Sequence, residues 1–231
     1  MTTLRVATYN LHGGVGVDRR IRPLRIVDVI NELRADVVSL QEVLSPVRGI
    51  DVHAALRSGT GLHLATMTTI ELAGGTFGNG LLSRWPILDV AEHRLAVGRR
   101  EPRGALDATI GRDAPELRVI ATHLGLSAAE RHRQLARLVE ILRSEPQRPT
   151  VLAGDFNITR KRARELSEHA AHFGKADALA TFPSIAPVLP LDRIFAVGGA
   201  SIVDVAVHRS RKARVASDHL PLVATIELPS P

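Results

Sequence analysis

The residues of this sequence that could carry out chemistry stand where predicted β-strands end. Asn10 ends the first predicted strand, Glu42 ends the second, and His123 ends the strand before a long predicted helix. The other members of this set follow the next strand or precede the last one: Asp155, Asn157, Asp218 and His219. Enzymes built on sheets assemble their sites from the loops at strand ends, so we expect these side chains to meet at one site.

The donor atoms of this set are those that a hard divalent cation prefers. Carboxylate and amide oxygens, with one or two imidazoles and no thiol, are the ligands of Mg²⁺ or Mn²⁺. Magnesium typically keeps several waters and binds a substrate phosphate. The pattern therefore indicates metal-assisted hydrolysis of a phosphoester.

Each residue of the set also has a structural interpretation. A lone glutamate such as Glu42 is more often a helix cap or the partner of an arginine, and Asp192 stands beside Arg193. Residues 154–157, Gly-Asp-Phe-Asn, are all compatible with an ordinary turn, and His219 with a surface position. Their recurrence at successive strand ends favours a shared site over these separate explanations.

Composition limits the alternatives. The chain has 231 residues, 45% of them apolar, and we expect a single catalytic domain over residues 1–231. It contains no cysteine, which excludes disulfides, zinc-thiolate sites, iron–sulfur clusters and cysteine nucleophiles. We find no apolar run of membrane-spanning length and no secretory signal, so we expect a cytoplasmic protein without stable membrane insertion. The net charge of +6 favours anionic partners.

Short apolar runs and two amphipathic helices are predicted to position the polar residues. Helices are expected after Pro23 and after Ser127, where Glu130 completes a capping-box pattern. A further helix is expected around residues 163–171, and residues 50–111 read as a series of short strands. The remaining strands are predicted over residues 4–10, 36–43, 117–122, 150–153, 193–197, 201–207 and 222–228. Strands outnumber helices, which indicates an α/β or α+β protein with sheet-rich layers.

The glycine-rich loops do not support a nucleotide cofactor. Gly14-x-Gly16 lacks the third glycine of the dinucleotide fingerprint, and the chain has neither a Walker lysine motif nor a Gly-x-Ser-x-Gly elbow. Dehydrogenase, P-loop and serine-hydrolase functions are therefore set aside.

Seven short segments in chain order support the same chemistry. They are Thr-Tyr-Asn at 8–10, Ser-Leu-Gln-Glu-Val at 39–43, Gly-Asn-Gly-Leu-Leu-Ser at 78–83, Thr-His-Leu at 122–124, Gly-Asp-Phe-Asn at 154–157, Leu-Asp-Arg-Ile-Phe at 191–195 and Ser-Asp-His-Leu-Pro at 217–221. This series resembles the motifs of the endonuclease/exonuclease/phosphatase superfamily, which includes deoxyribonuclease I. The resemblance implies a four-layered α/β sandwich, two packed mixed β-sheets flanked by helices, with the site at one end of the sheets.

The resemblance also implies the metal ligands and the pair that acts on the attacking water. Glu42 resembles the principal metal ligand, with Asn10 beside it and Asp218 as a nearby or water-mediated ligand. Asp155 and Asn157 resemble the pair that orients the attacking water and supports the transition state.

Two histidines complete the implied site. Asp192 and His219 resemble a carboxylate–imidazole pair in which the carboxylate fixes the orientation of the ring. His123 resembles the second histidine, which contacts phosphate or assists the leaving oxygen, and the tyrosine that replaces it in apurinic-site enzymes has no equivalent here. Whether Asp155 or His219 is the general base stays open; we assign His219, because an imidazole needs less pKa tuning to act near neutrality.

Weaker candidates surround this set. Asn79, Arg103 and His12 are candidates for substrate binding, although an ion pair for Arg103 and a plain loop position for His12 are equally compatible with the sequence. Two basic clusters follow Asn157 and precede Asp218, and we expect them to rim the mouth of the site if these motifs meet. They consist of Arg160, Lys161, Arg162 and Arg164, and of Arg209, Arg211, Lys212 and Arg214.

These observations lead to one expected function and two alternatives. We expect a phosphodiesterase dependent on Mg²⁺ or Mn²⁺ that acts as a monomer on nucleic acid, a phospholipid head group or a small phosphodiester. A phosphomonoesterase of the same fold is the first alternative. A non-catalytic binding module is the second, and the sequence keeps both the glutamate and the Ser-Asp-His motif that such a module would lose.

Overall fold

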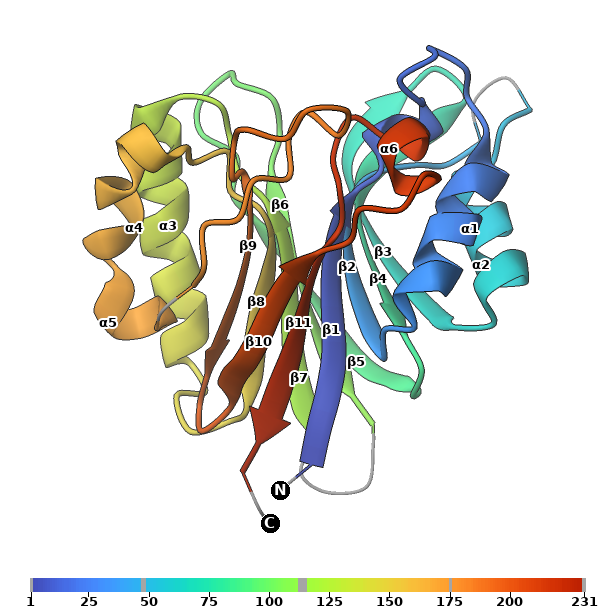
Figure 1. The fold of residues 1–231 in the computed structure, drawn as a ribbon. Helices are drawn as coiled ribbons and strands as arrows, with labels where there is room; N and C mark the ends of the chain where they lie inside the picture. The colour runs from blue at the N-terminus through green and yellow to red at the C-terminus, as the bar shows by residue number, and fades with distance from the viewer. Residues whose placement is uncertain (1, 47–48, 112–115, 175, 230–231) are drawn as a thin grey trace.

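Two β-sheets pack face to face, and helices cover the outer face of each sheet (Figure 1). The computed structural model describes residues 2–46, 49–111, 116–174 and 176–229. One sheet has the order β10-β11-β1-β2-β4-β3, and the other has the order β5-β6-β7-β8-β9. The strands of the first sheet are β1 (Thr2–Asn10), β2 (Val37–Leu44), β3 (His63–Leu72), β4 (Gly75–Ser83), β10 (Ser201–Val207) and β11 (Leu222–Leu228). Those of the second are β5 (Ile87–Arg94), β6 (Gly104–Ile110), β7 (Leu117–His123), β8 (Thr150–Asp155) and β9 (Asp192–Val197).

The helices form the two outer layers of a four-layered α/β sandwich, as the sequence predicts. On the six-stranded sheet lie α1 (Pro23–Leu33), α2 (Val52–Thr60) and α6 (Ala213–Ala216). On the five-stranded sheet lie α3 (Ala128–Arg143), α4 (Arg164–Ser167) and α5 (Ala170–Phe173). One apolar cluster fills the space between the sheets, and one lies under each helical layer. Burial of these clusters is the main force that holds the layers together.

Helices α1 and α3 begin where the sequence signals indicate. Pro23 occupies the first turn of α1, and Ile26, Ile30 and Leu33 are buried along one face of that helix. Ser127 caps α3, because its hydroxyl accepts a hydrogen bond from the backbone N–H of Glu130 at 3.3 Å. The predicted strands are present, with ends that differ by a few residues.

The prediction of short strands throughout residues 50–111 is wrong at its start, where helix α2 stands. Asp51 caps this helix with its side chain, and Gly61 ends it in a left-handed conformation (φ 67°). Its buried residues are Val52 and Leu56, a single pair one turn apart. So short an apolar face leaves little helical periodicity in the sequence. Strands β3 to β6 follow as predicted.

The single helix predicted around residues 163–171 is two short helices in the structure. Helix α4 ends at Ser167, and α5 begins after His169, whose backbone is not helical (φ −112°). In α4 no residue is buried, and in α5 only Phe173 is buried. Without a continuous apolar stripe, packing does not hold this segment as one helix.

Strand directions decide where the site can lie. Strand β1 runs parallel to β2 in one sheet, and β7 runs parallel to β8 in the other. The carboxyl ends of β1, β2, β7 and β8 lie at the same end of the sandwich, at the top of Figure 1. The loops that follow these four strands therefore converge at that end.

Candidate active site

Three neighbouring strands of the five-stranded sheet carry three candidate residues side by side. His123, the last residue of β7, pairs in register with Asp155, the last residue of β8. Asp155 pairs in turn with Asp192, the first residue of β9. All three side chains are buried. Residues distant in the sequence are thus brought together by strand pairing alone.

The sequence predicts that Glu42 ends its strand, but in the structure Glu42 lies at a β-bulge within that strand. Strand β2 continues to Leu44, and its pairing with β4 shifts between Leu40 and Val43. The backbone of Glu42 is left-handed (φ 57°), which is strained for a residue with a side chain. A bulge redirects a side chain, and it leaves Glu42 in contact with Asn10 at the end of β1.

Left-handed backbone recurs around the site. Among the described residues, five that are not glycine have positive φ, and three of these are His12 (48°), Glu42 (57°) and Asn157 (53°). Such conformations persist where the surrounding structure imposes them, and they are common at functional sites.

Asn10 joins the two sheets at the centre of the site. Its amide nitrogen Nδ2 lies 3.0 Å from Glu42 Oε1 and 3.2 Å from Asp155 Oδ2. Its carbonyl oxygen Oδ1 accepts a hydrogen bond from the backbone N–H of His12 at 3.0 Å. The Asn10 side chain is therefore fixed. It bridges the carboxylate of Glu42 in the six-stranded sheet and that of Asp155 in the five-stranded sheet.

A buried imidazole and carboxylate form a second centre. His219 Nδ1 lies 2.9 Å from Asp192 Oδ2, and the hydroxyl of Thr181 donates to the same oxygen at 2.5 Å. The other oxygen, Asp192 Oδ1, has no partner among the described residues. The ring of Phe182 lies over this region, with its centroid 5.0 Å from that of His219. His219 is thereby held with Nε2 toward Asp155, whose Oδ2 is 3.6 Å away.

The carboxylates around His219 hold its proton. Burial alone would lower the pKa of His219, but Asp192, Asp155 and Asp218 outweigh burial and raise this pKa to about 10. The imidazole is then protonated near neutrality. This removes the reason, stated from the sequence, that an imidazole needs little tuning to act as a base.

His123 has the opposite electrostatic environment. Burial lowers the pKa of His123 to about 3, and the positive charges of Arg103 and His219 add to this effect. Its Nδ1 lies 2.9 Å from an amino nitrogen of Arg103. Its Nε2 lies 3.2 Å from Asn157 Nδ2 and 3.6 Å from Asp155 Oδ2. His123 is therefore neutral, and Asp155 Oδ2 stands between the two imidazoles.

The donor atoms around Glu42 fit a hard divalent cation. Burial raises the pKa of Glu42, and the negative charges of Asp155 and Asp218 contribute to the rise, against the hydrogen bond from Asn10. Carboxylates that repel one another in this way are stabilised by a cation bound between them. The available donors are carboxylate and amide oxygens, which suit Mg²⁺ or Mn²⁺.

A second group of ligand atoms exists at Asp155, Asp192 and His219, whose donor atoms lie within 4.8 Å of one another. Here, however, Asp192 and His219 already satisfy each other by hydrogen bonding. Glu42 has only Asn10 as a hydrogen-bond donor among the described residues. We therefore regard the group around Glu42 as the better place for a cation.

The structure places the remaining candidates at or near this centre. Asp218 is partly exposed, with Oδ1 3.7 Å from His12 Nδ1 and within reach of the Ser217 hydroxyl at 3.3 Å. Asn79 is buried and donates to the backbone carbonyl of Gly104 at 2.8 Å, so its amide N–H supports the contact between sheets. A small hollow is lined by both Glu42 and His123, together with Thr69, Phe77, Gly78, Asn79, Arg103 and Gly104.

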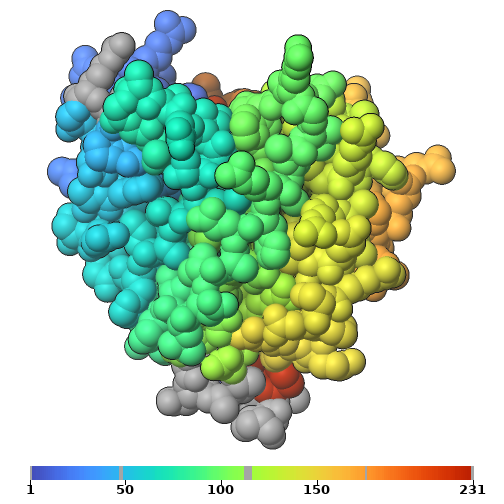
Figure 2. Space-filling view, turned by 180° about the vertical axis from the view of Figure 1, so that it is seen from behind, coloured from blue at the N-terminus to red at the C-terminus, as the bar shows by residue number. Residues whose placement is uncertain are grey.

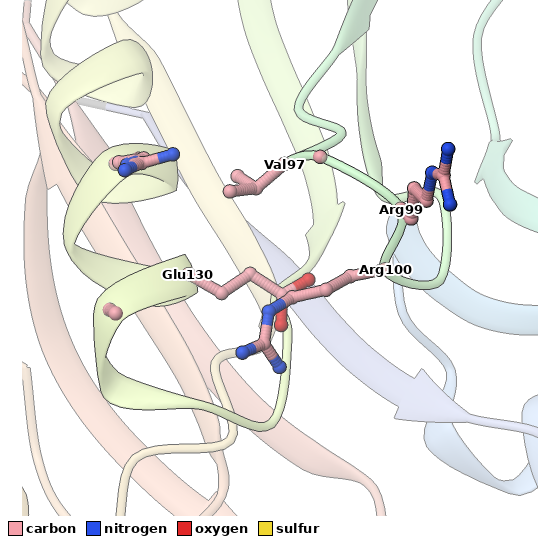
Figure 3. Close-up of a pocket in the computed structure, with 7 residues that line it drawn as sticks. Val97, Arg99, Arg100 and Glu130 are labelled. Carbon is pink, nitrogen blue, oxygen red and sulfur yellow. The ribbon is translucent and has the colours of Figure 1, made fainter.

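An arginine-lined surface continues outward from this hollow. Arg103 and Arg100 both line an adjoining hollow, and Arg100 also lines a third one, of about 460 Å³, with Arg99 and Arg133 (Figure 3). The loop around residue 100 stands out at the upper rim of the molecule (Figure 2). Arg99, Arg100 and Arg133 are exposed and have no acidic ion-pair partner among the described residues. Sequence reasoning did not single them out, although the doublet Arg99-Arg100 precedes Arg103 closely.

The two predicted basic clusters are partly neutralised where they stand. Arg162 pairs with Glu165 at 3.6 Å, and Lys212 pairs with Asp28 of helix α1 at 3.1 Å. That the two basic clusters lie at the mouth of the site stays a prediction.

Two polar residues of the site were missed from the sequence. Thr181 reaches Asp192 from the loop before β9, and no local sequence signal marks it. The Ser217 hydroxyl donates to the backbone carbonyl of Asn10 at 2.8 Å and accepts from the backbone N–H of His219 at 3.2 Å. Ser217 belongs to the Ser-Asp-His segment that the sequence analysis identified, but the sequence did not predict its hydrogen bonds with Asn10 and His219.

Fold and site together define a four-layered α/β sandwich with a polar site at the strand ends, the architecture of one class of phosphoester hydrolases. The model of the endonuclease/exonuclease/phosphatase family matches residues 7–219. The chain belongs to this family, which confirms the resemblance drawn from its motifs.

Similar proteins agree on the fold. The chain is 31% identical, over 246 aligned residues, to the uncharacterized protein YbhP of Escherichia coli, covering 98% of this chain and 97% of that one. A crystal structure of an endonuclease/exonuclease/phosphatase from Beutenbergia cavernae superposes with a TM-score of 0.83 at 24% identity, covering 100% of this chain and 72% of that one. TDP2 of D. rerio, solved with a single-strand DNA product, gives a TM-score of 0.72 at 17% identity, covering 98% and 100%. At such identities the likeness to these two structures concerns the fold.

Within the described ranges, no helix combines the length and the apolar character needed to cross a membrane.

Proposed function

We propose that this protein is a hydrolase of phosphodiester bonds that depends on Mg²⁺ or Mn²⁺. The family generally comprises hydrolases of phosphate esters, which supports this class of activity. The observation that carries the proposal is the position of Asn10 Nδ2, 3.0 Å from Glu42 and 3.2 Å from Asp155. It holds a candidate metal ligand and a candidate catalytic carboxylate in one site.

Glu42, with Asn10 and Asp218, would hold the cation. When bound, the cation would offset negative charge on the phosphate in the transition state. Its charge would also oppose protonation of His219, which adjoins Asp218 in the chain.

The protein's own residues supply the activation of water. In its neutral form, His219 accepts the proton of the attacking water at Nε2, while Asp192 accepts the hydrogen bond from Nδ1–H and fixes the orientation of the ring. Asp155 orients the water, since its Oδ2 lies 3.6 Å from Nε2 of both His219 and His123. The backbone N–H of Asn157 donates to Asp155 Oδ1 at 2.9 Å and fixes that carboxylate.

The exposed arginines beside the site favour a substrate that carries further anionic groups. Arg99, Arg100 and Arg133 line one hollow. Arg100 and Arg103 line a second hollow, and Arg103 also lines the catalytic hollow. A substrate with further anionic groups next to the reacting phosphate would contact them. We propose nucleic acid, a phospholipid head group or a small phosphodiester as the substrate, and a phosphomonoester as the alternative.

Hydrolysis of bis-p-nitrophenyl phosphate with Mg²⁺ or Mn²⁺ tests the proposal. We expect metal-dependent release of nitrophenol by the unmodified protein and loss of that release in Glu42→Ala. Absence of turnover with every metal would contradict it and leave the non-catalytic binding module. Plasmid DNA, RNA, phospholipid vesicles and phosphomonoesters, assayed with the active metal, then identify the substrate.

A further inference from the structure

Arg103 is a buried arginine that contacts a histidine of the site. Only 7% of its side chain is exposed, and its Nη1 atom lies 2.9 Å from His123 Nδ1. The same nitrogen lies 3.1 Å from Glu101, a half-exposed carboxylate. The Nε atom of Arg103 has no partner among the described residues. The guanidinium thus contacts His123 on one side and Glu101 on the other.

This contact determines where His123 carries its proton. A guanidinium can donate hydrogen bonds but cannot accept them. His123 Nδ1 must therefore present a lone pair to Arg103, and a neutral imidazole then carries its hydrogen on Nε2. A proton on Nδ1 would instead point at a permanent cation 2.9 Å away.

The Nε2 hydrogen of His123 faces the site. Among the described residues, the carboxylate oxygen that faces Nε2 is Asp155 Oδ2, 3.6 Å away. The amide nitrogen of Asn157, which donates to the Leu124 carbonyl at 2.9 Å, is closer to Nε2, at 3.2 Å, and is also a donor. An Nε2 proton meets this neutral donor, whereas an Nδ1 proton would meet the Arg103 cation at 2.9 Å, which is the less favourable contact. Rotating that amide would place two oxygens against each other at Leu124.

The Nδ1 atoms of the two histidines consequently have opposite hydrogen-bonding roles. Asp192 accepts from Nδ1 of His219, whereas Arg103 donates to Nδ1 of His123. Each ring turns its Nε2 toward the same oxygen of Asp155 at 3.6 Å. A carboxylate sets one ring and a guanidinium sets the other.

We propose that Arg103 is a positioning residue that locks His123 as a neutral hydrogen-bond donor at Nε2. The inference rests on the proposed hydrolytic function. It decides between the two roles expected for His123, which are contact with the phosphate and assistance to the leaving oxygen. Loss of the Nε2 proton would leave an imidazolate, because Arg103 blocks reprotonation at Nδ1. His123 therefore donates a hydrogen bond to a phosphate oxygen and does not transfer its proton to the leaving group.

Nitrogen-15 NMR of histidine-labelled protein tests the tautomer without any turnover. His123→Gln assigns the resonances of this ring. We expect a protonated Nε2 and an unprotonated Nδ1 in the unmodified protein, retention of that state in Arg103→Lys, and its loss in Arg103→Met. Arg94→Met, at an exposed position of β5, is the matched control and should retain it. A protonated Nδ1 in the unmodified protein would overturn the proposal.

A double-mutant cycle in bis-p-nitrophenyl phosphate hydrolysis separates positioning from direct phosphate binding. If Arg103 acts through His123, Arg103→Met lowers kcat in the unmodified background and has no further effect in the His123→Gln background. If Arg103→Met instead reduces kcat/KM equally in both backgrounds, mainly by raising KM, then Arg103 binds phosphate itself. That result would overturn its role as a positioning residue. If the unmodified protein hydrolyses no ester yet shows the expected tautomer, the proposed function fails while the tautomer assignment stands.

Discussion

The Nδ1 atom of His219 lies 2.9 Å from Oδ2 of Asp192, and both side chains are buried. This pair fixes the ring with Nε2 toward Asp155. Removal of the imidazole in His219→Ala should lower kcat by roughly 10²–10⁴-fold, the usual contribution of a positioned base. Asp192→Asn should lower kcat as well, because it removes the charge that orients and stabilises the protonated ring. Steady-state hydrolysis of bis-p-nitrophenyl phosphate measures both effects.

The same assay decides between the two candidate bases. Asp155→Asn keeps the size of the side chain and removes its charge. If His219→Ala retained most of the turnover while Asp155→Asn abolished it, the role of base would pass to Asp155. The raised pKa of His219 makes this comparison necessary.

Divalent metal should stabilise the unmodified protein and leave Glu42→Gln unaffected. A ligand that binds only the folded state adds about 2.7 kcal/mol to the free energy of unfolding at one hundred times its Kd. Without metal, Glu42→Gln should be at least as stable as the unmodified protein, because the substitution removes a charge that burial and the neighbouring carboxylates disfavour. Urea unfolding with and without Mn²⁺ measures both effects. Asp204→Asn, at an exposed strand position, is the matched control, and a metal response lost there as well would argue against a specific site.

The metal-free protein should lose stability as the pH falls below about 6.5, in part because of His123. Burial holds the pKa of His123 near 3 in the folded state, against an ordinary value of 6.5. Below 6.5 the unfolded chain binds a proton at this residue that the folded chain does not, so the contribution to the free energy of unfolding falls by up to roughly 1.4 kcal/mol per pH unit until about pH 3. His123→Gln should flatten this part of the stability profile, measured by urea unfolding in a series of buffers. His63→Gln, at an exposed position, should leave the slope unchanged, and equal slopes in all three proteins would contradict the assignment.

Binding of a nucleic acid should depend steeply on salt through the arginines beside the site. Each phosphate contact contributes about 0.7–0.9 to the slope of log affinity against log salt concentration. We expect a lower slope after combined substitution of Arg99, Arg100 and Arg133 by alanine, measured as KM for an oligonucleotide at several salt concentrations. Turnover of bis-p-nitrophenyl phosphate, which has a single phosphate, should change little. A flat salt response of the unmodified protein would remove nucleic acid from the substrates.

Local structure was predictable wherever a single segment carries its own signal. Pro23 with its apolar stripe marked α1, and Ser127 with Glu130 marked α3, because caps and periodicity act within a few residues. Helix α2 was missed because only Val52 and Leu56 are buried on it. The helix expected around residues 163–171 divides because it lacks a continuous apolar face.

The sequence by itself carried the motif series that identifies the family, with polar residues at or near the strand ends. Only the tertiary structure decided how these residues contact one another. The bulge at Glu42, the Thr181 hydroxyl on Asp192 and the contact of Arg103 with His123 join segments that are far apart in the chain. Such contacts depend on strand register and on the packing of two sheets, which no local pattern encodes. The charge states of His123 and His219 follow from these contacts, because burial and neighbouring charges set pKa values.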